Sequence, residues 1–210
     1  MKKNCTEVVF VLDRSGSMCG LEKDTIGGFN SLINKQKKQD GEVLVSTVLF
    51  NDSSVVIHDR KPIDEVRLMT NKDYEVYGCT ALLDALGSSI RHIGNIHKYA
   101  RVEDVPEHTM FVIITDGMEN ASRYYSKERV KSMIEYEKEK YGWEFLFLAA
   151  NMDAIDTASQ YGIDKDHAVN YQCDSVGTRL NYEVLDEAIQ CICSGVPLSK
   201  SWKSKIEKRK

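Results

Sequence analysis

Five side chains that carry oxygen ligands stand in three short segments of the chain: Asp13, Ser15, Ser17, Thr80 and Asp116. The first three share one tight loop, in which Gly16 allows a sharp turn. Carboxylate and hydroxyl oxygens are hard ligands, which suit Mg²⁺, Mn²⁺ or Ca²⁺ and argue against Zn²⁺ or Cu²⁺. If the three segments meet, an octahedral cation would complete its shell with water, and a carboxylate of a partner protein could take one exchangeable position.

Each aspartate directly follows a predicted buried strand. Residues 8–12 and 110–114 are continuous apolar runs without alternation, the pattern of central parallel strands that helices cover on both faces. In open α/β sheets, ligands bind beyond the carboxyl ends of the strands, so Asp13 and Asp116 should share one edge. Thr80 stands at a predicted helix N-cap and would join them if its loop reaches the same edge.

Helix and strand patterns alternate along the rest of the chain. Apolar residues three to four apart predict a helix over 21–38, and runs at 43–50 and 54–58 around a turn predict a hairpin with one antiparallel strand. Further helices are predicted at 82–93, 127–140, 154–161 and 179–193, and further strands at 143–149 and 168–171. The sequence therefore predicts a doubly wound α/β fold with a mostly parallel sheet, one antiparallel edge strand and helices on both faces.

Length and composition are those of one soluble globular domain. The 210 residues are 42% hydrophobic and 29% charged, which is enough for one substantial core. The formal net charge of −4 is too slight and too dispersed to favour a nucleic-acid or membrane surface. The amino terminus has no apolar stretch long enough for export or membrane spanning, and the six cysteines include no CxxC pair, so we expect a cytoplasmic protein with reduced thiols.

We expect one domain over residues 1–198, followed by a basic tail over residues 199–210. The tail carries six basic residues and one acidic residue, a composition typical of a solvated, frayed terminus. An alternative is a nucleic-acid-associated scaffold in which Trp202 of this tail stacks on a base, although the acidic body of the chain argues against it.

Three segments together are similar to the metal-ion-dependent adhesion site (MIDAS) of the von Willebrand factor type A family: Asp13-Arg14-Ser15-Gly16-Ser17, Gly78-Cys79-Thr80 and Ile114-Thr115-Asp116-Gly117. Their order and spacing fit, and the resemblance covers residues 4–195. Stretches 115–122 and 142–154 resemble small stand-alone bacterial or phage members of the family. Cys79 departs from the many relatives that have a second glycine before the threonine, and its side chain would slightly reposition the loop.

The resemblance implies a site and a function. Ser15, Ser17 and Thr80 would coordinate the cation directly or through water. Asp13 and Asp116 would act mostly through water, and they would exchange roles when a ligand arrives. Family members bind proteins and few are enzymes, so we expect a non-catalytic protein-binding module whose Mg²⁺, Mn²⁺ or Ca²⁺ holds an Asp or Glu of its partner.

Simpler and different interpretations stay open. Taken singly, each of the five side chains is typical of a helix cap or a turn, and only their conjunction favours a metal site. A Mg²⁺-dependent phosphoryl-transfer hydrolase would use Asp13 as its nucleophile. Such enzymes usually need a second acidic group two positions on, where this chain has Ser15, and neither G-x-G-x-x-G nor G-x-x-x-x-G-K-[ST] occurs. Asp84, Glu119 and Asn120 are candidates for supporting hydrogen bonds near the loops.

Overall fold

The computed structural model describes residues 1–150 and 153–209. In this part of the chain, six strands form one sheet: β1 (Lys2–Asp13), β2 (Glu42–Phe50), β3 (Ser54–Pro62), β4 (Pro106–Thr115), β5 (Glu144–Ala149) and β6 (Ala168–Asn170). The α-helices are α1 (Glu22–Gln36), α2 (Leu82–Tyr99), α3 (Lys127–Tyr141), α4 (Ala154–Gln160), α5 (Ser175–Cys193) and α6 (Ser204–Glu207). Asn151 and Met152, part of the stretch 142–154 for which we expect a resemblance to bacterial or phage proteins, lie outside the described residues, as does Lys210.

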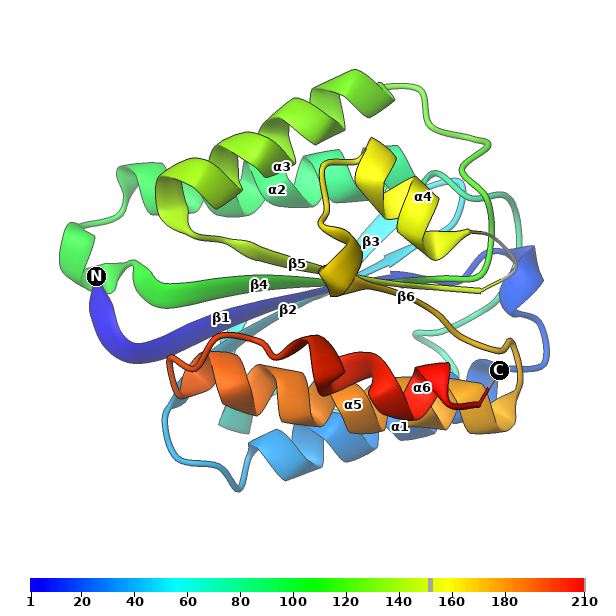
Figure 1. The fold of residues 1–210 in the computed structure, drawn as a ribbon, viewed down its shortest axis with the longest axis horizontal. Coiled ribbons are helices and arrows are strands. Elements are labelled where there is room, and N and C mark those ends of the chain that lie inside the picture. Colours follow the sequence, from blue (N-terminus) through cyan, green and yellow to red (C-terminus); the bar gives the residue numbers. More distant parts are fainter. Residues whose placement is uncertain (151–152, 210) are drawn as a thin grey trace.

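Helices cover both faces of the sheet, with α2, α3 and α4 on one side and α1, α5 and α6 on the other (Figure 1). Val8, Phe10 and Leu12 of β1 pack into the core beneath α1 and α5. Val9 and Val11 pack into the core beneath α2 and α3. This burial on both faces explains why the strand shows no alternation of apolar and polar residues. Among the described helices, none is long and apolar enough to cross a lipid bilayer.

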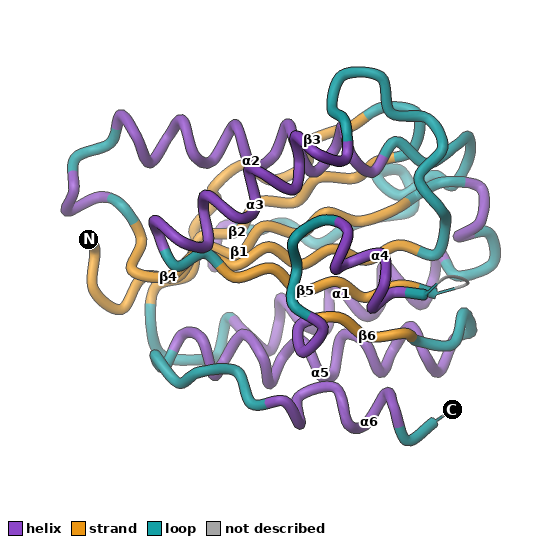
Figure 2. Tube along the Cα trace, turned by 45° about the horizontal axis from the view of Figure 1, so that its top comes forward, coloured by secondary structure: helices purple, strands orange, loops and turns teal. Residues whose placement is uncertain are grey.

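The strand order is β3-β2-β1-β4-β5-β6, and β3 alone runs antiparallel to its neighbour. Figure 2 shows the central strands side by side, with helices crossing in front and behind. The chain builds the sheet outward from β1 in one direction and then, from β4, in the other, so the connections reverse between β1 and β4. The predicted fold class is confirmed. Asp13 is the last residue of β1 and Asp116 directly follows β4, the two strands that flank the reversal point.

Two elements begin earlier than the sequence predicts. β1 starts at Lys2 rather than at residue 8, because its first part already pairs with β4, where Lys2 lies beside Pro106. α5 starts at Ser175 rather than at residue 179, because Asp174 caps it by accepting a hydrogen bond of 2.7 Å from Gly177 N. Both starts lack a regular pattern of apolar residues, and apolar periodicity therefore missed them.

The carboxy-terminal segment is packed on the domain. Trp202 is 6% exposed and Ile206 is 4% exposed, and both belong to the core on the α1–α5 side. The Lys203 ammonium donates hydrogen bonds of 2.8 Å to the carbonyls of Lys165 and Ala168. The expectation of a solvated tail is therefore wrong for residues 199–209, because Trp202 and Ile206, four positions apart, present one apolar face to the body of the domain. That residues 1–198 form a domain of their own stays a prediction.

Candidate metal centre

Backbone hydrogen bonds join the loops that follow β1 and β4 to the loop that precedes α2. Gly16 N donates to Gly78 O at 3.0 Å, which links the first loop to the segment before α2. Asn120 N donates to Thr80 O at 3.0 Å, which links that segment to the loop after β4. Three segments far apart in the sequence thus meet at the reversal point of the sheet.

Four of the five predicted site residues are linked by short contacts between side-chain oxygens. Ser15 Oγ lies 3.0 Å from Ser17 Oγ, and the Thr80 hydroxyl donates a hydrogen bond of 3.0 Å to Ser15 Oγ. The Ser17 hydroxyl donates to Asp116 Oδ1 at 2.5 Å. The fold therefore gathers into one cluster residues that are 65 and 99 positions apart in the chain.

The fifth residue, Asp13, is buried next to this cluster and is 1% exposed. Its carboxylate accepts hydrogen bonds from Ser15 N at 2.7 Å and from Thr115 Oγ1 at 2.5 Å. Burial raises the pKa of the Asp13 carboxyl above its ordinary value, although the hydrogen bonds from Thr115 and Ser15 oppose this shift. Asp13 thus holds the Ser15 loop in place from the interior.

Thr80 does not cap the helix as the sequence predicts. The N-cap residue of α2 is Ala81, and the Thr80 hydroxyl points into the oxygen cluster instead. Glu119 takes over part of the capping role, because Leu83 N donates to its carboxylate at 2.9 Å. Asn120 Oδ1 accepts a hydrogen bond of 2.9 Å from Thr80 N. Two predicted supporting residues therefore fix the backbone and leave the Thr80 hydroxyl to the cluster.

The third predicted supporting residue, Asp84, ties the loop after β4 to the first turn of α2. Its carboxylate accepts backbone hydrogen bonds of 2.8 to 2.9 Å from Arg123, Tyr124 and Tyr125. Asp84 therefore fixes the backbone of this loop against α2 and does not itself contact the oxygen cluster in these hydrogen bonds.

Three residues at the centre were not singled out from the sequence. Thr115 donates to Asp13, the Tyr74 hydroxyl donates to the Asp13 carbonyl, and the Cys173 thiol donates to Asp116 Oδ2 at 3.3 Å. Thr115 could have been found, because it ends the apolar run 110–114 of β4 just before Asp116. Tyr74 and Cys173 come from loops without a motif, and only the assembled sheet brings them close.

The oxygen cluster fits a small divalent cation. Adjacent ligands of an octahedral Mg²⁺, each about 2.1 Å from the ion, lie about 3.0 Å apart. Ser15 Oγ has this distance to both Ser17 Oγ and Thr80 Oγ1. A Cβ placed on Gly117 would lie 2.6 Å from Thr80 Oγ1 and 3.0 Å from Ser17 Oγ. The hydroxyls therefore converge on a space that a side chain at position 117 would fill.

A Gly117→Ala substitution should fill that space. We expect the added methyl group to weaken Mg²⁺ binding about tenfold or more, by analogy with changes next to metal ligands. The melting temperature should change little, because Gly117 lies on a loop outside the core. Calorimetric titration with Mg²⁺ measures the affinity, and Gly27→Ala is the control because a Cβ there meets nothing within 4 Å. Equal affinities of wild type and Gly117→Ala would contradict this position of the ion.

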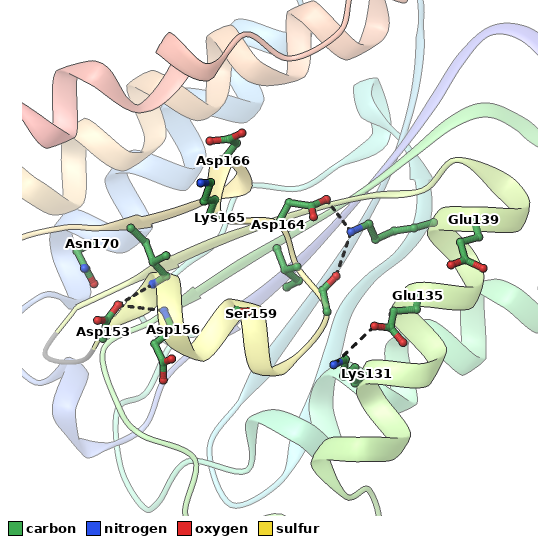
Figure 3. A pocket seen from close by; sticks show the side chains of 14 residues that line it. Lys131, Glu135, Glu139, Asp153, Asp156, Ser159, Asp164, Lys165, Asp166 and Asn170 are labelled. Carbon is green, nitrogen blue, oxygen red and sulfur yellow. Dashed lines mark hydrogen bonds and ion pairs between the residues drawn. The ribbon is translucent and has the colours of Figure 1, made fainter.

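Other places fit a metal ion less well. Within residues 1–150 and 153–209, no three His, Cys, Asp or Glu side chains are grouped so that they could hold an ion. A cleft of about 1060 Å³ between α3, α4 and the turn before β6 is rich in charged side chains. Figure 3 shows Lys131 paired with Glu135 there, and Lys138 Nζ lies 2.8 Å from Asp164 Oδ2. Because several of its charges neutralise one another, the cleft is no competing metal centre.

No protein-family model and no curated protein matches the chain. Solved structures do match. The vWF domain of the type V pili tip protein Mfa5 from Porphyromonas gingivalis has a TM-score of 0.66 at 10% identity, over 92% of this chain and 97% of that one. The ArnB paralog VWA2 from Sulfolobus acidocaldarius has a TM-score of 0.56 at 17% identity, over 89% of this chain and 45% of that one. Proximal thread matrix protein 1 from the mussel byssus, with a zinc-occupied MIDAS motif, has a TM-score of 0.59 at 15% identity, over 92% of this chain and 47% of that one.

The likeness concerns the fold, and it spans most of this chain. The chain covers less than half the length of the Sulfolobus and mussel proteins, whereas it covers nearly all of the Mfa5 domain. The strand order and the reversal between β1 and β4 place the oxygen cluster at the edge where open α/β sheets bind ligands. Together, the architecture and these structural neighbours show that the chain has the fold of von Willebrand factor type A domains.

Proposed function

We propose that this domain binds a divalent cation at Asp13, Ser15, Ser17, Thr80 and Asp116 and uses it to hold an acidic residue of a protein partner, without catalysing a reaction. The strongest support is the cluster of three hydroxyls and one carboxylate, two of whose contacts have the spacing of neighbouring Mg²⁺ ligands. The mussel protein carries zinc in its MIDAS motif. The hard oxygen ligands of this chain favour Mg²⁺ or Mn²⁺.

The hydroxyl and carboxylate side chains of the centre would have different roles in binding the cation. Ser15 and Thr80 are buried whereas Ser17 is exposed, so the space between the hydroxyls opens to solvent on the Ser17 side. Asp116, which accepts from Ser17, would offset positive charge at the centre, and Asp13 would keep the Ser15 backbone in place. A bound cation would supply an open coordination position for the carboxylate of the partner.

Exposed apolar side chains next to the centre suggest the surroundings of that carboxylate. Met118 is 70% exposed and directly follows Gly117, and Tyr77 is 52% exposed and directly precedes Gly78. Large apolar side chains are costly to expose and often mark protein-binding surfaces. We therefore propose that the acidic residue of the partner is flanked by apolar residues that pack on Met118 and Tyr77.

Neither alternative function is supported by the geometry. A nucleophilic Asp13 would need to reach a substrate, but both of its carboxylate oxygens accept hydrogen bonds and the side chain is buried. Base stacking would need an accessible Trp202, but this ring is buried and its indole N–H donates to Asp166 O at 2.8 Å. Protein binding through the cation remains the proposal that uses the exposed part of the centre.

We also propose a reducing, cytoplasmic setting for the domain. Cys19 and Cys79 are exposed and free, and both belong to loops of the metal centre. Exposed thiols on one protein surface persist unoxidised in reducing compartments. Reactivity of both thiols in protein isolated without reductant would test this setting.

The first experiment is a calorimetric titration of chelator-treated protein with Mg²⁺ and with Mn²⁺. We expect one site in the wild type and an affinity at least 100-fold weaker in Asp116→Ala, because removal of a ligating group exceeds the effect of a neighbouring one. Asp40→Ala makes the same charge change in an exposed loop, and it should bind as the wild type does. Absence of binding by the wild type, or equal binding by all three proteins, would overturn the proposed site.

The partner chemistry can be tested with the same variants. Phage-displayed peptides are selected on the immobilised domain in Mg²⁺ and then released with EDTA. We expect the released peptides to contain an acidic residue next to apolar ones, and to lose binding when that residue is changed to Asn or Gln. Peptides that stay bound in EDTA, or that bind Asp116→Ala equally well, would argue for another binding surface.

A further inference from the structure

A second site candidate lies on the α2–α3 face, where a groove between the two helices extends from Arg129 in the first turn of α3 to Tyr141 at its end. The groove between them has a volume of about 440 Å³. It is lined from α2 and α3 together, with Arg91, Gly94 and Lys98 on one wall and Arg129 and Glu137 on the other. Figure 1 shows the two helices side by side on the sheet, with the metal loops beyond their first turns.

Among the described residues, four cations that line this groove form no salt bridge with a carboxylate: Arg91, Lys98, Arg129 and Lys140, the last of which donates a hydrogen bond to the Tyr136 hydroxyl. Lys98 lies over the Tyr99 ring, Arg129 over Tyr125, and Lys140 over the rings of Tyr136 and Tyr141. In contrast, Lys131 and Lys138 of the same α3 helix face the other way and pair with acidic side chains. On a chain of net charge −4, this unpaired positive charge favours an anionic ligand.

The α3 wall of the groove carries a buried carboxylate that lacks a hydrogen-bond donor for one of its oxygens. Glu137 is 9% exposed, and its Oε2 has no hydrogen-bond partner among the described residues. The carboxylate faces Gly94, where a Cβ would lie 3.1 Å from Oε1, so the opposite helix offers no side chain there. Burial raises the pKa of the Glu137 carboxyl, although the nearby His97 and Lys140 side chains oppose this shift, and leaving a polar group at this depth without a partner is unfavourable.

The two features together restrict the ligand. An inorganic anion would satisfy the cations but would leave Glu137 without a donor. A ligand with a small N–H or O–H donor at one end and negative charge at the other would satisfy both. We propose that this groove binds a nucleotide, whose phosphate contacts Arg91 and Arg129 from opposite walls and whose base amino group or ribose hydroxyl donates to Glu137.

Two further properties of the groove agree with a nucleotide. Its volume of about 440 Å³ is within the range of small-molecule sites. Tyr136 and Tyr141 border it and are about half exposed, and a flat base could stack on them if the Lys140 side chain, which lies over both rings, moves aside. The site shares no residue with the metal centre, so each proposal can be tested independently of the other.

The test is a titration of the full chain, in EDTA, with GMP, AMP and sodium phosphate. We expect at least one nucleotide to bind tenfold or more tightly than phosphate does. Glu137→Gln, which keeps the shape and removes a buried charge, should weaken nucleotide binding at least tenfold and leave phosphate binding unchanged. Arg129→Ala should weaken both, and Lys131→Ala, a matched change outside the groove, should weaken neither. Preference for GMP or AMP identifies a base donor, and equal binding identifies the ribose.

Several results would overturn the proposal. Nucleotides that bind no more tightly than phosphate would show an unspecific anion-binding surface. A nucleotide affinity of Glu137→Gln equal to that of the wild type would show that the buried carboxylate does not recognise the nucleotide. A poly-glutamate peptide that binds more tightly than every nucleotide would show a docking surface for acidic proteins instead. Circular dichroism melting of each variant separates these outcomes from unfolding.

Discussion

Glu7→Ala is expected to lose roughly 3–5 kcal/mol of unfolding free energy, the usual effect of leaving a buried charge without its partner. Glu7 is completely buried in β1, where it accepts hydrogen bonds from Arg60 Nε at 2.7 Å and from His97 Nε2 at 2.6 Å. Arg60 reaches it from a left-handed backbone conformation with φ of 46°, which is rare outside glycine. Urea unfolding followed by circular dichroism measures the loss.

A double-mutant cycle distinguishes the ion pair from simple loss of packing. Arg60→Ala with Glu7→Ala should cost less than the sum of the single changes, with a coupling of about 0.5–3 kcal/mol. Lys2→Ala removes the partner of Glu42 in an exposed pair on the same strand, and it should change stability little. Additive effects within about 0.5 kcal/mol would show that Glu7 and Arg60 do not depend on each other.

Trp202→Ala should lower the unfolding free energy by roughly 3–5 kcal/mol, the range for large aromatic residues removed from a core. The ring fills part of the core on the α1–α5 side, and its indole N–H bonds to Asp166 O. Thermal melting of Trp202→Ala and of Trp202→Phe, which should lose less, measures this contribution. Lys208→Ala changes an exposed side chain of the same segment and is the control.

Removal of residues 199–210 extends this prediction. The shortened chain should melt at a lower temperature than Trp202→Ala, because it also loses Ile206 and the two hydrogen bonds from Lys203. An unchanged melting temperature would show that residues 1–198 are a complete domain and that the terminal segment only rests on it.

The fold was predictable because its central strands have a simple signature. The central parts of β1 and β4, residues 8–12 and 110–114, are buried on both faces, so each is an unbroken apolar run, and each run is closely followed by an aspartate. The alternation of helices and strands allows few sheet topologies, and in these the carboxyl ends of β1 and β4 lie at the same edge of the sheet. Four of the five site residues could be brought together from these facts alone, because parallel strands place their carboxyl ends on the same side.

The missed features depend on contacts between distant residues. The charges around Trp202 and Ile206 have the composition of a tail, and only the apolar surface of the assembled domain makes that segment fold back. Glu7 looks like an exposed strand residue until Arg60 and His97 cover it. Thr80 has the local features of a helix N-cap, but its hydroxyl donates a hydrogen bond to Ser15, a residue 65 positions away, instead of capping the helix.

The way the three loops are tied together bears on the lifetime of the protein. The hydrogen bonds from Gly16 N to Gly78 O and from Asn120 N to Thr80 O require β1, β4 and the start of α2 to be in place. An unfolded chain has no such site, so an ion bound there would favour the native state alone and would oppose unfolding of the whole domain. Proteases act on opened chains, and the cation supply of the cell would therefore influence how fast this protein is degraded as well as what it binds.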